Sequence, residues 1–216
     1  MASQCVHVFE LGYSADIDLV ASSKLINSCQ QEIWVDVLVG RHHIGDPDVH
    51  ARAYPKETLF KHFPARVPGE VYVGVTVAPI EGNLSTVTRD VDSIVLTLHR
   101  TQAVSAEAGR TKEEYVAQTL VTEWLWLQYR QATGDPDFGK LFHRRGRDCI
   151  FNLVLDKSEK VHKLRRGHIC KQCADKLDRA NVPASRVSAV RSVLSRVQEP
   201  SPPRPLTLML QRSVSY

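Results

Sequence analysis

Residues 111–132, TKEEYVAQTLVTEWLWLQYRQA, decide the fold because they carry the strongest helical pattern in the chain. Thr111 and Glu114 have the spacing of a capping box, in which each side chain hydrogen-bonds the backbone N–H of the other residue. The apolar positions recur at helical spacing, and they are Val116, Leu120, Trp124 and Leu127, widened by Val121 and Leu125. Gly134-Asp135-Pro136 ends the pattern. We therefore expect one long helix that ends near Ala132.

Strand patterns lie on both sides of this helix in the sequence. They cover residues 5–12 (CVHVFELG), 32–40 (EIWVDVLVG), 71–77 (VYVGVTV), 93–98 (SIVLTL) and 149–155 (CIFNLVL). A helix capped by Ser14 and reaching about Gln31 is predicted between the first two strands, and a last helix is predicted to begin at Ser185. Strand 32–40 is largely apolar on both faces, as in a covered sheet with a right-handed crossover. The predicted fold class is therefore α/β, with α+β character.

Charge divides the 216-residue chain into two parts. Residues 1–139 hold 11 Lys/Arg and 18 Asp/Glu, whereas residues 140–216 hold 17 Lys/Arg and 6 Asp/Glu. We expect an α/β core at 1–138, a basic subdomain with a C-terminal helix at 139–199, and a Pro-rich linker and tail at 200–216. A basic segment of this kind faces nucleic acid, an acidic partner or the acidic part of its own chain.

The composition also bears on the compartment. Five unevenly spaced cysteines argue against a secreted disulfide scaffold and favour the reducing cytoplasm. No apolar run approaches the roughly 20 residues that span a bilayer, and residues 1–10 lack the features of a signal peptide. We expect a cytoplasmic protein that has no membrane partner.

Cys170-Lys171-Gln172-Cys173 is the strongest chemical motif. Two thiols at this spacing can chelate one zinc ion from a tight turn. Cys149 lies 21 residues earlier, and His143 precedes Cys149 by six residues. A set of His143, Cys149, Cys170 and Cys173 would form a closed Cys3His site, which is structural because no coordination position is left for a substrate. We expect one structural Zn²⁺.

Alternatives to this zinc site stay open from the residues alone. His168 or His162 could supply the fourth ligand, and the pair Cys170 and Cys173 could instead be a redox pair or unligated. Three neighbouring cations would help to keep the thiols deprotonated, and they are Arg144, Arg145 and Arg147. The two remaining cysteines, Cys5 and Cys29, are predicted to be small core residues.

Two further clusters carry weaker signals. The segment His42, His43, Asp46, Asp48 and His50 could bind a metal ion, but a polar surface loop is the favoured interpretation.

Glu123 is a lone carboxylate on the long helix, and we expect it to face solvent or to pair with a basic group. Trp124 and Trp126 lie two residues apart on the helix and cannot both face the same core. We therefore expect one of the two tryptophans to be exposed at a partner surface.

In its order of elements the chain resembles the archaemetzincin branch of the metzincin metallopeptidases. The strands VYVGVTV and SIVLTLHR precede the helix TKEEYVAQTLVTEWLWL, and Cys149-Ile150-Phe151 and Cys170-x-x-Cys173 stand where the family carries CxM and CxxC. This resemblance implies a zincin-like mixed sheet with packed helices, followed by a small C-terminal zinc knuckle and helix.

The family's catalytic HExxH motif is missing. No two of the nine histidines are four residues apart, so no helix can present the two imidazoles that hold a catalytic zinc ion. If Glu123 occupies the place of the catalytic glutamate, Thr122 and Trp126 stand at the ligand positions. The resemblance thus implies a fold that has lost its metallopeptidase centre.

Three functions follow as expectations. The first is a non-catalytic, zinc-stabilised binding or scaffold subunit with a protein partner in a macromolecular assembly. The second is a nucleic-acid-binding zinc protein that uses the basic third, where Arg165 and Arg166 join the three arginines near Cys149. The third is a metal-dependent hydrolase with a relocated or partner-completed site, for example at residues 42–50.

Overall fold

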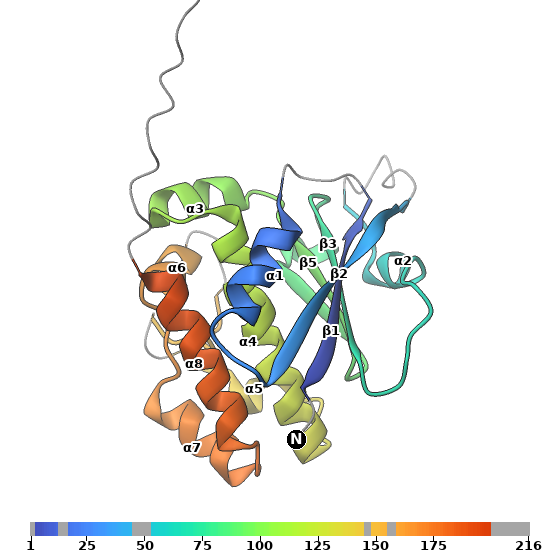
Figure 1. Cartoon of the computed structure of the whole chain (residues 1–216). Helices are drawn as coiled ribbons and strands as arrows, with labels where there is room; N and C mark the ends of the chain where they lie inside the picture. The colour runs from blue at the N-terminus through green and yellow to red at the C-terminus, as the bar shows by residue number, and fades with distance from the viewer. Residues whose placement is uncertain (1–2, 13–16, 45–52, 145–147, 155–158, 200–216) are drawn as a thin grey trace, which may run out of the picture.

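One five-stranded sheet with helices on both faces forms the described part of the chain, residues 3–12, 17–44, 53–144, 148–154 and 159–199 of a computed structural model (Figure 1). The strands are β1 (Gln4–Leu11), β2 (Ile33–His42), β3 (Val71–Thr76), β4 (Thr86–Arg89) and β5 (Ser93–Thr97), in the order β2-β1-β3-β5-β4. All neighbours pair in parallel except β4, which is antiparallel to β5. The predicted α/β class is therefore confirmed.

In the described part of the chain, the first three α-helices each follow a strand, and the other five come after the last strand. The helices are α1 (Leu19–Asn27), α2 (Lys56–Phe60), α3 (Thr101–Ala108), α4 (Lys112–Thr133), α5 (Phe138–Leu141), α6 (Lys160–Arg166), α7 (Lys171–Arg179) and α8 (Ala184–Gln198), with a short 3-10 turn, η1, at Glu81–Asn83. No helix in the described ranges is long and apolar enough to cross a membrane.

Two predicted helix starts were wrong. Asp18 caps α1, because its Oδ1 accepts the backbone N–H of Ala21 at 2.8 Å, and Ser14 lies outside the described residues. α8 begins at Ala184, so Pro183 rather than Ser185 stands at its N-cap, and no side chain caps the helix there.

The predicted strand at 149–155 was also wrong. Residues 149–154 form turns with two isolated bridges, from Cys149 to His168 and from Asn152 to His143. The backbone N–H of Asn152 donates to the Cys149 carbonyl at 2.9 Å, so the segment turns back on itself and joins no ladder.

Helix α4 lies between the sheet and α8 (Figure 1). Its capping box is present as predicted, with the backbone N–H of Glu114 donating to Thr111 at 3.1 Å and that of Thr111 donating to Glu114 at 2.8 Å. Every residue from Glu114 to Tyr129 is buried except Thr119, because the sheet, α1, α3 and α8 all pack around this helix.

Apolar residues form two clusters, one on each face of the sheet. The larger cluster joins Val6 and Val8 of β1 to α4 and α8, and it contains residues from both sides of position 138. The smaller cluster joins Phe9 and Leu11 to α2 on the opposite face. Alternate residues of β1 therefore serve different faces, as a pleated strand requires.

Candidate functional site

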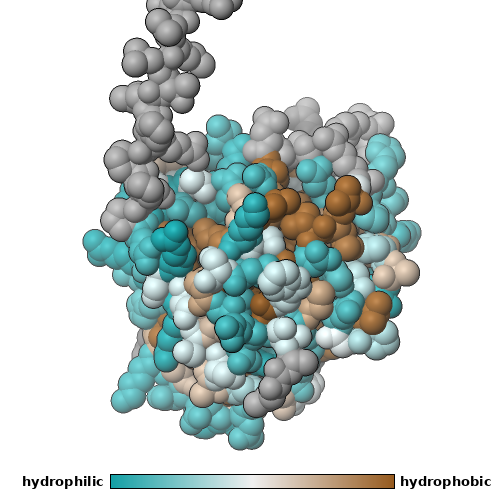
Figure 2. Space-filling model, viewed as in Figure 1, coloured by the Kyte–Doolittle hydropathy of each residue, from teal (hydrophilic) through white to brown (hydrophobic). Residues whose placement is uncertain are grey.

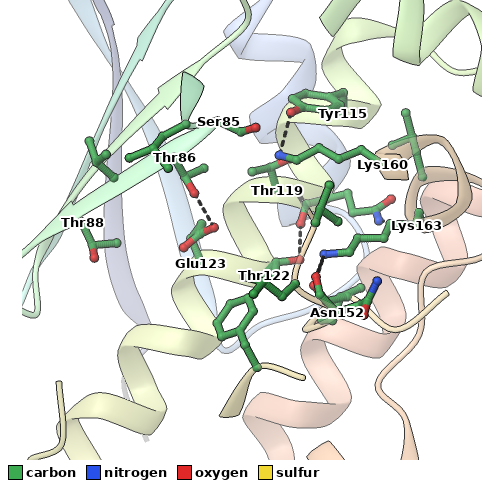
Figure 3. Close-up of a pocket in the computed structure, with 18 of the residues that line it drawn as sticks. Ser85, Thr86, Thr88, Tyr115, Thr119, Thr122, Glu123, Asn152, Lys160 and Lys163 are labelled. Atoms are coloured by element: carbon green, nitrogen blue, oxygen red, sulfur yellow. Dashed lines mark hydrogen bonds between the residues drawn. The ribbon is translucent and has the colours of Figure 1, made fainter. Parts of the chain in front are cut away.

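A cavity of about 500 Å³ lies beside α4, between the edge strand β4 and residues 150–154 and 160–164 (Figure 3). Its apolar wall includes Leu84, Val87, Phe142, Ile150 and Leu164. Polar side chains enter from three sides, and they are Ser85, Thr86, Thr88, Tyr115, Gln118, Thr119, Thr122, Glu123, Asn152, Lys56, Lys160 and Lys163. A hollow of this size, in which polar groups converge against an apolar wall, is the usual form of a binding or active site.

One face of α4 supplies the floor of the cavity. Gln118, Thr119 and Thr122 line it at positions i, i+1 and i+4, whereas Trp126 points away and contacts Phe142 at a ring-centroid distance of 5.7 Å. Of the two positions that would flank Glu123 as zinc ligands, only Thr122 faces the hollow. None of the described residues that line the cavity is a histidine or a cysteine.

Glu123 lies deep in this cavity and is only 7% exposed. The Thr86 hydroxyl donates to its Oε1 at 2.8 Å (Figure 3). Burial raises the pKa of Glu123, and the Thr86 hydrogen bond and the positive charges of Lys160 and Lys163 oppose that rise. Of the two alternatives expected for Glu123, solvent exposure was therefore wrong, because β4 and α6 cover this part of α4. The other alternative, a basic group beside the carboxylate, agrees with the charges of Lys160 and Lys163.

Two lysines of α6 form the opposite wall (Figure 3). Lys163 donates to the backbone carbonyls of Ile150, at 3.0 Å, and Asn152. Burial, aided by the charge of Lys160, lowers the pKa of Lys163 to about 8. Lys160 donates to the Tyr115 hydroxyl at 3.1 Å.

Two buried amide oxygens in the cavity have no hydrogen-bond partner in the described chain, Oε1 of Gln118 and Oδ1 of Asn152. The Gln118 Nε2 is engaged, since it donates to the Lys163 carbonyl at 2.7 Å. Leaving a buried acceptor unpaired costs roughly 1–3 kcal/mol. A ligand with N–H or O–H donors would remove this cost.

A second candidate site brings together His143, Cys149, Cys170 and Cys173, whose ligand atoms lie within 4.8 Å of one another. The sulfurs of Cys149 and Cys173 are 3.8 Å apart, and the Cys170 sulfur is 3.4 Å from the His143 Nε2. A tetrahedral zinc site requires sulfur–sulfur edges of roughly 3.8 Å and sulfur–nitrogen edges of roughly 3.5 Å. These spacings and this donor set fit zinc.

Local backbone contacts bring these ligands together. Cys170 precedes α7 and Cys173 lies in its first turn. His168 pairs with the 148–150 segment, since its N–H donates to Asp148 at 3.0 Å and its carbonyl accepts from Ile150 at 2.9 Å. His162 and His168, the alternative fourth ligands, are exposed and lie outside the cluster.

The thiols of this cluster influence one another. The Cys173 thiol lies against the Cys149 sulfur, and its hydrogen bond lowers the pKa of Cys149. The same contact, with burial, raises the pKa of Cys173. Metal ligation requires thiolates, so a bound cation would replace the proton that the two sulfurs share.

Neither tryptophan of α4 is exposed, which contradicts the expectation of a partner surface there. Trp124 is 0% and Trp126 is 2% exposed, because opposite faces of α4 pack on the sheet and on other helices. The exposed indole is Trp34, at 56%, on the edge strand β2. Figure 2 shows hydrophobic side chains gathered over this edge of the sheet.

The remaining candidate residues are dispersed. Arg144, Arg165 and Arg166 are exposed, whereas Arg145 and Arg147 lie outside the described residues. His42 and His43 are described, but Asp46, Asp48 and His50 are not. Cys29 is partly buried at the edge of the core, and Cys5 lies instead beside His7, 3.6 Å from its Nε2. The prediction that Cys5 is a core residue was wrong, because it is only partly buried and belongs to neither apolar cluster.

Sequence reasoning missed the lysine wall of the cavity. In the sequence, Lys160 and Lys163 are recognisable only as members of the basic third, and Asn152 falls within a predicted strand. The available signal was the spacing of the two lysines, which places them on one face of a helical turn.

A five-stranded mixed sheet, with a long helix beside a cavity under its antiparallel edge strand, defines this chain as a protein of the archaemetzincin fold. It is similar to archaemetzincin from Archaeoglobus fulgidus, solved in complex with malonate, at a TM-score of 0.54 and 19% identity, covering 80% of this chain and 99% of that one. Archaemetzincin from Methanopyrus kandleri matches at a TM-score of 0.48 and 15% identity, over 83% and 96% of the two chains. No protein-family model and no curated protein matches the sequence.

Proposed function

We propose that this chain is a non-catalytic, zinc-stabilised protein of the archaemetzincin fold that uses its cavity to bind an extended segment of a protein partner. The observation that carries the proposal is the cavity-facing side of α4. Gln118, Thr119 and Thr122 line the cavity there at positions i, i+1 and i+4, and they offer an amide and two hydroxyls rather than the imidazoles that a hydrolytic zinc ion requires.

The edge strand β4 supports an extended ligand. Among the described strands, β4 pairs with β5 alone, so one side of its backbone is left for another strand. Because the Ser85 carbonyl accepts from Thr97 of β5, the backbone groups of Thr86 and Thr88 point to the opposite side. A peptide that added to this edge would pass over the cavity, where Gln118 and Asn152 offer unpaired acceptors.

The cysteine cluster supports the structural half of the proposal. Cys149 and Cys173 are almost fully buried, and the cluster joins the turn at 149–152 to the start of α7. A zinc ion held by three cysteines and His143 would have no open position. Its contribution would therefore be to folding.

The test measures hydrolysis and binding on the full-length, tag-free, zinc-loaded protein. Mass spectrometry of a mixed peptide library is expected to show no cleavage above that of a heat-denatured control. Library peptides should be retained in extended conformation, and Thr88→Pro should abolish their retention because it removes an outward backbone N–H. Thr88→Val keeps that N–H and serves as the matched control. Zinc-dependent cleavage, or equal retention by Thr88→Pro, would overturn the proposal.

A further inference from the structure

A second group of metal-binding side chains lies at the start of β1, formed by Cys5, His7 and Glu70. One ligand atom from each residue lies within 4.8 Å of those of the other two. The His7 Nε2 is 3.6 Å from the Cys5 sulfur and 2.7 Å from the Glu70 Oε2. We propose that these three residues bind a zinc ion whose fourth position is open to an external ligand.

The backbone places these ligands on one face of the sheet. Cys5 and His7 are two residues apart on β1, so both side chains leave the face opposite Val6 and Val8, which pack toward α4. Glu70 arrives from a turn in which its N–H donates to the Val67 carbonyl at 3.2 Å. Because β1 pairs with β3 directly after Glu70, the backbone fixes the positions of all three ligands relative to one another.

The spacings need little change to accept zinc. A tetrahedral site requires a sulfur–nitrogen edge of roughly 3.5 Å and a nitrogen–oxygen edge of roughly 3.4 Å. The Cys5–His7 distance already matches the first value. The Glu70 carboxylate must retreat slightly from His7, which its 29% exposed side chain permits.

The surrounding residues orient the proposed ligands, as the residues behind the ligands of a metal site commonly do. Asp36 stands directly across from His7 in β2, and its carboxylate is 3.7 Å from the His7 Nδ1, which is buried and makes no hydrogen bond with the described residues. Histidines that bind zinc commonly face a carboxylate with their second nitrogen. The Tyr72 hydroxyl donates to Glu70 at 3.2 Å and restrains the carboxylate in the same way.

The charge balance of the group also favours a cation. Glu70 and Asp36 both face His7, and the described residues around this imidazole include Cys5 and Tyr72 but no lysine or arginine in an ion pair with either carboxylate. A thiol, an imidazole and a carboxylate form a mixed donor set that suits zinc better than calcium or magnesium. Three protein ligands leave one coordination position, as in zinc sites that bind water or an exogenous group.

The test is a Co²⁺ titration of the metal-free, full-length, tag-free protein under reducing conditions. Two equivalents should bind in wild type. The first should give a strong sulfur-to-cobalt band from the site with three cysteines, and the second a weaker band from the single Cys5 thiolate. Azide should shift only the second band, because that site alone has an open position.

Substitutions test whether the second equivalent of Co²⁺ binds to Cys5, His7 and Glu70. Cys5→Ser, His7→Gln and Glu70→Gln should each weaken its binding at least about tenfold, and Asp36→Asn should weaken it about tenfold through His7. Cys29→Ser, His162→Ala and Glu57→Gln are the matched controls and should bind two equivalents. A wild-type protein that binds one equivalent, or a second equivalent that survives unchanged in all three ligand variants, would overturn the inference. The first band reports separately on the cysteine cluster.

Discussion

Among single residues, Glu123 shows most clearly that the cavity lowers the stability of the fold, because a carboxyl group is buried there. It is a carboxyl group enclosed by β4, α4 and α6, with the Thr86 hydroxyl as its hydrogen-bond donor. The nearby ammonium groups of Lys160 and Lys163 only partly offset its burial. Proteins retain such groups where a ligand or a reaction needs them, at some expense of stability.

Glu123→Gln is expected to stabilise the protein at about pH 7. The folded chain holds the Glu123 proton to higher pH than the unfolded chain does, because burial raises its pKa above 4.5. Its contribution to stability is therefore complete at low pH and is lost as the pH rises through the folded pKa. Denaturant unfolding at several pH values should show a gain for Gln that disappears near about pH 3. A gain that is independent of pH would contradict the burial argument.

Cys173→Ser is expected to release one zinc ion and to lower the free energy of unfolding by more than about 4 kcal/mol, since the loss of a structural metal belongs to the most severe class of substitution. Metal analysis and thermal melts measure both effects. If the variant does not fold, chelator-induced melting of wild type gives the same information.

Cys29→Ser is the control, because Cys29 lies outside the cluster. His143→Ala should also release the ion, whereas His168→Ala should not. Retention of zinc by His143→Ala would assign the fourth ligand to another residue.

Among the elements, α4 shows that the position of a helix can be predicted from the sequence whereas the burial of all its faces cannot. Its capping box and apolar stripe predicted the helix correctly, because both signals are local. The burial of Trp124 and Trp126 together depends on two layers, since Trp124 donates to Gln4 of β1 at 2.8 Å whereas Trp126 packs against Phe142, outside the sheet. No pattern within residues 111–132 records that second layer.

Trp124→Ala and Trp126→Ala should each lower the free energy of unfolding by about 3–5 kcal/mol, since each leaves a large cavity in the core. Trp34→Ala removes the same side chain from an exposed position, and it should change stability by no more than about 0.5 kcal/mol. Urea unfolding followed by circular dichroism measures all three. Equal losses at the three sites would contradict the buried placement.

Other elements escaped prediction for related reasons. β4 is four residues long and only Val87 in it is apolar, so it has no apolar alternation that the sequence could reveal. The turn at 149–152 has strand-forming residues, yet the pairing of Cys149 with His168 gives it a different backbone. The candidate ligands His143, Cys149, Cys170 and Cys173 could be named from their types and spacing, whereas the grouping of Cys5 and His7 with Glu70 depends on the pairing of β1 with β3.

At the scale of the whole molecule, the basic third is partly engaged within the fold. Lys163 donates to carbonyls of the 150–152 turn, Arg165 donates to the Glu107 carbonyl, and Arg186 donates to Gln128. Cations that already neutralise backbone dipoles are poorly placed to meet phosphates in addition.

Binding to duplex DNA or RNA should therefore be weak, and it should not show the steep loss with rising salt that many phosphate contacts produce. Fluorescence anisotropy at about 50 and about 200 mM salt measures the slope. A fall in affinity of about a thousandfold or more over this range would favour nucleic acid as the partner. An Arg165→Ala, Arg166→Ala double variant would then locate the contact.

The ligands of the cysteine cluster come after all five strands and α4 in the chain, and α8 comes later still. During synthesis the sheet and α4 leave the ribosome before α8 does, so the side of α4 that packs against α8 is exposed at that stage. If the cluster holds zinc as proposed, metal capture and the docking of α8 would then follow the formation of the sheet. Zinc shortage would in that case leave chains with a formed sheet but an undocked α8, which proteases and chaperones recognise.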